Sequence, residues 1–151
     1  MDIASILDQV ISHAESTGIF DGGVNGHEPK SSPGNGLTCA VWAQRIGPAP
    51  LGSGLAITTG LLTLNVRIYT PMLQQPYDAI DPMVIAAVDA LITEYSGAFT
   101  LGGNVRNVDL LGAYSPGLMA EAGYINQDGK LMRIMTLTVP LVINDLWTQG
   151  P

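Results

Sequence analysis

The fold is decided by the stretch Leu62–Tyr95, which reads LTLNVRIYTPMLQQPYDAIDPMVIAAVDALITEY. Its first eight residues alternate between apolar and polar side chains, which predicts a β-strand with one buried face. A proline-rich turn then leads to Asp81-Pro82, an N-cap residue followed by proline at the first helical position. The helix expected there ends at Gly97, and its apolar face consists of Val84, Val88, Leu91, Ile92 and Tyr95.

The alternation in the strand also assigns its two faces. We expect the side chains of Leu62, Leu64, Val66 and Ile68 to face the helix layer. The opposite face then carries Thr63, Asn65, Arg67 and Tyr69, which are available to a neighbour.

Working outward, apolar residues spaced at three and four positions predict an amphipathic helix over 3–14, stopped by Gly18. Strands are expected over 37–46, 55–70, 105–111, 118–125 and 130–143. Gly60 is the expected site of a bulge or break in the second of these strands. Asp128-Gly129 predicts a tight hairpin between the last two. Residues 21–36 and 47–54 are expected to be loops, the first of them long enough to suggest a function.

The expected element order is therefore α-β-β-α-β-β-β, within a single domain over residues 1–151. This order predicts an α+β fold in which two helices pack on one face of a mixed, mainly antiparallel sheet.

Composition narrows the range of functions. The chain has 46% hydrophobic and only 13% charged residues, and a formal net charge of −7. So few charges suit either a surface covered in an assembly or a small monomer rich in Gly and Ala. Thirteen acidic against six basic residues argue against specific nucleic-acid binding, because phosphate contacts need clustered Lys and Arg. There is no signal-peptide pattern and no long apolar run, so we expect no membrane association.

Few groups could carry catalysis. His13 lies on the polar side of the first helix, and His27-Glu28 lacks a third metal ligand at a known spacing. Cys39 is the only cysteine and sits in an apolar strand, which suggests an inert core residue. No phosphate loop and no nucleophile elbow is present. We therefore expect no enzyme, no catalytic residue, no metal and no cofactor.

Four arginines stand inside apolar strands: Arg45, Arg67, Arg106 and Arg133. A strand arginine commonly lies on a solvated face with its stem on its neighbours. The sharper hypothesis is that some of them cross a subunit boundary and pair with Asp or Glu, since Arg is favoured at interfaces. Together with Tyr69, these arginines are the candidate inter-subunit contacts.

Short sequence segments along most of the chain resemble those of the tail terminator proteins of long-tailed (siphovirus-type) phages that infect actinobacteria. The segments that carry the resemblance are His27–Lys30, Gly36-Leu37, Asn65–Leu73, Asp78–Pro82, Ala87–Leu91, Tyr95–Gly97, Val108–Ala113, Ala122–Tyr124, Gln127–Leu131 and Val142–Trp147.

The resemblance implies a structural virion protein that is made in the host cytoplasm and resides at the head-proximal end of the tail. Such proteins form a homo-oligomeric ring, usually a hexamer, that caps the tail tube and ends its polymerisation. The ring presents a surface to the head-side connector or stopper protein, and DNA passes through its lumen without specific binding. The implied partners are thus the tail-tube protein and the connector.

Two alternatives remain open at this point. A head-tail connector or stopper, or a tail-tube protein, would have a similar fold. Outside this class, a small hydrolase or ligand-binding α+β domain would be monomeric or dimeric with an enclosed polar pocket.

Overall fold

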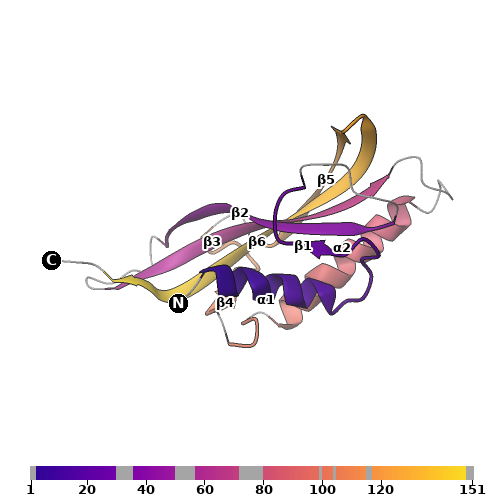
Figure 1. Ribbon diagram of the computed structural model, residues 1–151. Coiled ribbons are helices and arrows are strands. Elements are labelled where there is room, and N and C mark those ends of the chain that lie inside the picture. The colour runs from indigo at the N-terminus through magenta and orange to yellow at the C-terminus, as the bar shows by residue number, and fades with distance from the viewer. Residues whose placement is uncertain are drawn as a thin grey trace.

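The computed structural model describes residues 3–29, 36–49, 57–71, 80–98, 100–103, 105–114 and 117–148 (Figure 1). Its elements are α1 (Ile3–Glu15), β1 (Val24–Asn25), β2 (Thr38–Pro48), β3 (Ile57–Pro71), α2 (Ile80–Gly97), β4 (Asn107–Val108), β5 (Met119–Gln127) and β6 (Lys130–Thr148). The sheet order is β1-β2-β3-β6-β4, and β5 also pairs with β6. Every pair is antiparallel except β1 with β2. Both helices lie on one face of the sheet, so the α+β class is confirmed (Figure 1).

The core forms where the helices meet the central strands. The four residues of β3 expected to face the helices all belong to the main core, namely Leu62, Leu64, Val66 and Ile68. Helix α1 contributes the buried residues Ile6, Val10 and Ala14 to the same core, and α2 contributes Val84, Ala87, Leu91 and Tyr95. Val88 and Ile92 are only partly buried, whereas the small residue Ala87 is buried. The two helices are joined by the Tyr95 hydroxyl, which donates a hydrogen bond to the Val10 carbonyl at 3.0 Å.

The element order contains one strand more than expected, because the segment predicted as a long loop includes β1. Its two residues pair in parallel with Cys39 and Ala40. The backbone at Gly22 can pass close to Thr38 because glycine has no Cβ. A Cβ at this position would collide with the Thr38 side chain. The Gly22 amide donates to the Leu37 carbonyl, and the Cys39 amide donates to the Gly23 carbonyl. Residues 30–35 of that predicted loop, and 50–54 of the second one, lie outside the described residues.

A long ribbon of β3 and β6 forms the centre of the sheet, with pairs from Ile57↔Thr148 to Pro71↔Met132. The predicted break at Gly60 is confirmed, because the register shifts between Thr58 and Gly60. A Cβ at Gly60 would collide with the Leu146 side chain, so only glycine fits there without a shift. The predicted start of this strand at Leu55 lies outside the described residues.

The predicted hairpin between β5 and β6 is also confirmed. Asp128 and Gly129 have φ values of 52° and 76°, as a two-residue loop with both residues at positive φ requires. The distal half of the hairpin curls away from the helices (Figure 1). A second, smaller core forms there from Ala40, Tyr69, Met132 and Ile134.

The strand predicted over 105–111 is much shorter than expected, since β4 has only Asn107 and Val108. The reason lies in the next residue, Asp109, which is buried. Its carboxylate accepts hydrogen bonds from the amides of Ala113 and Tyr114 at 2.8 and 3.0 Å. The Asp109 amide still donates to the Pro140 carbonyl of β6 at 2.8 Å, and the Asp109 carboxylate then holds the turn that follows.

Candidate assembly surfaces

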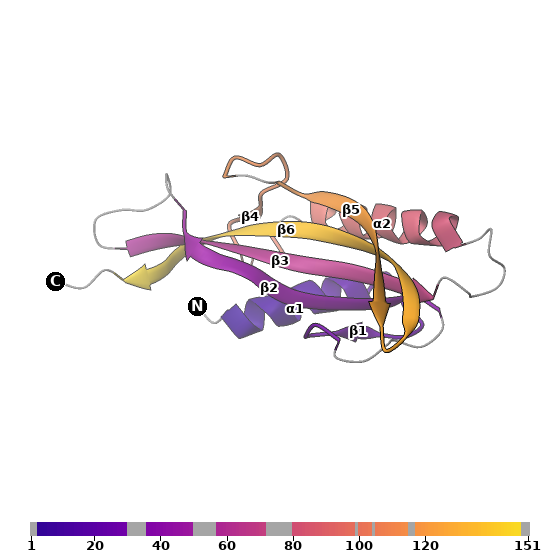
Figure 2. The same ribbon diagram turned by 90° about the horizontal axis from the view of Figure 1, so that it is seen from above.

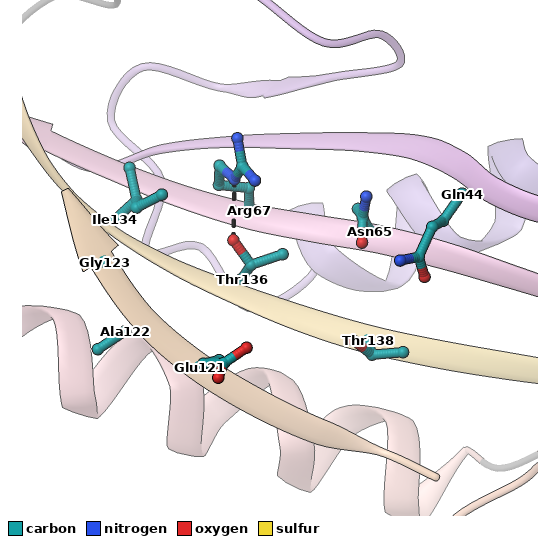
Figure 3. Close-up of a pocket in the computed structure, with 9 residues that line it drawn as sticks. All are labelled: Gln44, Asn65, Arg67, Glu121, Ala122, Gly123, Ile134, Thr136 and Thr138. Carbon is teal, nitrogen blue, oxygen red and sulfur yellow. Dashed lines mark hydrogen bonds between the residues drawn. The ribbon is translucent and has the colours of Figure 1, made fainter. Parts of the chain in front are cut away.

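The face of the sheet opposite the helices carries an open polar groove of about 280 Å³ (Figure 3). Its floor comes from β3 and β6, and β5 forms one wall. Figure 2 shows β2, β3 and β6 running side by side, with the curled hairpin at one end. The residues that line the groove are Gln44, Asn65, Arg67, Glu121, Ala122, Gly123, Ile134, Thr136 and Thr138.

Arg67 is the best anchored of the candidate contact residues. Its Nε donates a hydrogen bond to Thr136 Oγ1 at 2.8 Å (Figure 3). Its guanidinium carbon lies 5.1 Å from the centre of the Trp42 ring, which is cation–π distance. Arg67 therefore ties β3 to β6 and β2 on the groove face, in addition to any role at a boundary.

Arg133 is held in a similar way on the hairpin. Its guanidinium carbon lies 4.7 Å from the centre of the Tyr124 ring, and Nη1 donates to the Gly123 carbonyl at 3.3 Å. Tyr124 itself is 57% exposed. Alternation along β5 and β6 places Tyr124 and Arg133 on the hairpin face that points away from the groove.

Tyr69 differs from the arginines because its side chain is only 1% exposed. It lies beneath the hairpin with Met132 and Ile134. Burial raises its pKa above the ordinary value of 10.0, an effect that Arg67 opposes. The alternation placed Tyr69 on the right face, but the chain itself covers that position and leaves no side-chain surface for a neighbour.

Arg45 and Arg106 are both exposed. Arg106 precedes β4, and its backbone amide donates to the Val142 carbonyl at 2.9 Å. Arg45 follows a bulge in β2, where the register with β3 shifts between Ala43 and Arg45. Within the described residues, neither side chain has an ion-pair or hydrogen-bond partner.

The sheet also has two open edges, which the sequence patterns did not reveal. Strand β2 is covered by β1 only at Cys39 and Ala40, so the described residues leave the rest of its outer side unpaired. Strand β5 pairs with β6 on one side and has no described strand on the other. Open edges are unusual in folded chains unless they are shielded or used for pairing.

Groups suited to catalysis are sparse in the described part of the chain. His13 Nδ1 lies 2.7 Å from Glu94 Oε1, where it links α1 to α2. Burial raises the pKa of the Cys39 thiol to about 12, so the thiol stays protonated at neutral pH. The described residues hold no group of three side chains able to bind a metal ion, and neither described helix is long and apolar enough to cross a membrane.

Comparison with protein-family models finds no match for this chain, and comparison with curated proteins finds none either. The geometry of its own surfaces therefore carries the functional argument.

Proposed function

We propose that this chain is a tail terminator subunit: a structural virion protein that closes into a ring on the tail tube of a long-tailed phage. The ring ends tube polymerisation and provides the surface for head attachment. The observation that carries the proposal is the presence of two different open edges on one sheet, at β2 and β5.

Two different edges are what a ring subunit requires. A ring closes when one surface of each subunit binds a different surface of the next, and the contact repeats through a full turn. A two-fold dimer, in contrast, needs one self-complementary patch. The chain offers one edge on each side of its sheet, at β2 and at β5.

The residues that resemble tail terminators lie along the same framework. Asn65–Pro71 belongs to β3, Gln127–Leu131 forms the hairpin turn, and Val142–Trp147 lies in β6. The low charged fraction of 13% also suits a subunit much of whose surface is covered by copies and partners.

Termination requires the two faces of the ring to differ. One face must fit the last ring of tube protein, while the other must not accept another tube subunit. Residues 22–36, residues 47–54 and the hairpin turn at Asp128 are the candidate contacts, of which residues 30–35 and 50–54 lie outside the described residues.

The proposal is tested by growing tail tubes from tube protein with and without this chain, and measuring their lengths by electron microscopy. Tubes grown in its presence should be shorter, each with a single additional ring at one end. Native mass spectrometry should find an assembly of six chains of 15.9 kDa each, in solution or on the tube. Overlong tubes without a terminal ring would refute the proposal. Unlimited polymerisation of this chain alone would identify a tail-tube protein instead, and rings that bind only the head side would identify a connector or stopper.

A further inference from the structure

The two open edges have opposite strand directions. Strands β2, β3, β6 and β5 are neighbours in that order, and each adjacent pair is antiparallel. With four alternating strands from edge to edge, β5 runs opposite to β2. A second copy in the same orientation therefore meets β5 with an antiparallel β2, so the sheet can continue from one copy to the next without a change of pairing type.

Backbone groups on both edges point outward in the way such pairing needs. The Leu118 amide, just before β5, donates outward to the Leu110 carbonyl. Alternation then turns the amides and carbonyls of Ala120, Ala122 and Tyr124 to the same outer side. On β2, the Cys39 amide donates outward to Gly23, so the backbone groups of Val41 and Ala43 point outward as well.

The two edges also carry opposite charges on the same face of the sheet. Glu121 of β5 lines the groove (Figure 3). Arg45 of β2 pairs with Thr63, which alternates with the core residues of β3 and so faces the groove side. Both Glu121 and Arg45 are exposed, and neither has a hydrogen-bond or ion-pair partner among the described residues.

We propose that β5 of one subunit pairs antiparallel with β2 of the next, and that Glu121 forms an ion pair with Arg45 across this seam. This inference rests on the proposed ring assembly and specifies its contact.

Strand β1 sets the offset between the copies. Glu121 lies in the same row of the sheet as Thr136, Arg67 and Ala40. At Ala40 the outer side of β2 is already occupied by β1. The neighbour's β5 must therefore pair further along β2, towards Arg45, which displaces each copy by roughly 14 to 17 Å along the strands. Such a stagger means that the strands are tilted to the ring axis, as in a closed barrel.

The test uses two charge reversals, Arg45→Glu and Glu121→Arg. Each variant alone places like charges at every seam and should reduce the concentration of rings at least tenfold, measured by native mass spectrometry and sedimentation. An equal mixture of the two variants should restore rings. When the two variants alternate around the ring, every second seam pairs the Glu121 of one variant with the Arg45 of the other, as in the original chain. At the remaining seams the two introduced residues face each other, so the charges are again opposite but exchanged between the strands.

The mixture also controls for folding, because a misfolded variant cannot be rescued by its counterpart. The matched control is Asp89→Arg, a charge reversal of an exposed residue on α2 and outside both edge strands, which should form rings like the original chain. The proposed seam is refuted if either single variant forms rings normally. It is also refuted if the mixture of the two variants fails to restore rings. Failure of the seam is distinguishable from failure of the terminator function: in the first case the original chain still shortens tubes and forms rings, and in the second it does neither.

Discussion

At the scale of single residues, the arginines divide into two kinds. Arg67 and Arg133 stack on aromatic rings of their own chain, at 5.1 and 4.7 Å from the ring centres. Arg45 and Arg106 are exposed and make no such contact with the described residues. The residue type alone could not separate these roles, because the stacking partners Trp42 and Tyr124 come from neighbouring strands whose register is set by the whole sheet.

Cys39 provides a pH-dependent prediction. Burial favours the neutral thiol, so the pKa of about 12 in the folded chain exceeds the ordinary value of 9.0. The corresponding stability is present in full below pH 9 and is lost as the pH rises towards 12. The free energy of unfolding should fall by roughly 1 kcal/mol from this group between pH 8 and pH 10, measured by urea denaturation.

The Cys39→Ala variant serves as the reference, because it lacks the titrating thiol. It should lose less stability over the same pH range, although the buried phenol of Tyr95 still favours its neutral form. An equal loss in both proteins would contradict the assignment. A thiol reagent at pH 8 should also leave the folded chain unmodified and react after unfolding, as Cys39 is fully buried.

At the scale of elements, Gly60 lies at the register shift in the central ribbon of β3 and β6. The Gly60→Ala substitution places a methyl group against the Leu146 side chain and should lower the free energy of unfolding by about 1–3 kcal/mol. Gly47→Ala is the matched control in β2, because a Cβ there meets no atom within 4 Å. Shortening the opposing side chain in Gly60→Ala/Leu146→Ala should relieve the collision. If Gly60→Ala and Gly47→Ala have the same urea midpoint, the close contact with Leu146 does not restrict the residue at position 60.

Elements with a local signal were predictable. The apolar stripe of α1, the proline-marked start of α2, the hairpin turn at Asp128 and the break at Gly60 all follow from residues close together in sequence. β1 was missed because it depends on Gly22 meeting a strand that follows much later in the chain. β4 was overestimated because the Asp109 carboxylate binds two amides of the following turn. The open edges could not be predicted either, since strand order arises only from long-range pairing.

At the scale of the whole molecule, the net charge of −7 gives a prediction about DNA. A ring around a DNA channel should let the duplex slide, and an acidic subunit with six basic residues offers few phosphate contacts. Fluorescence anisotropy with a labelled duplex at 50 mM salt should detect no saturable binding up to about 10⁻⁴ M protein, the weak end of non-specific affinity. A known non-specific DNA-binding protein is the positive control. Binding that weakens steeply with added salt would instead reveal a basic face.

The position of β6 has a consequence for biosynthesis. It is the last described element along the chain, yet it lies at the centre of the sheet and pairs with β3, β4 and β5. During translation, the inner side of β3 has no partner until this segment leaves the ribosome, because the pair Ile57↔Thr148 joins distant parts of the chain. The β5 edge likewise gains its supporting strand only at that moment. A nascent chain that still lacks β6 therefore has neither a completed sheet nor a supported β5 edge.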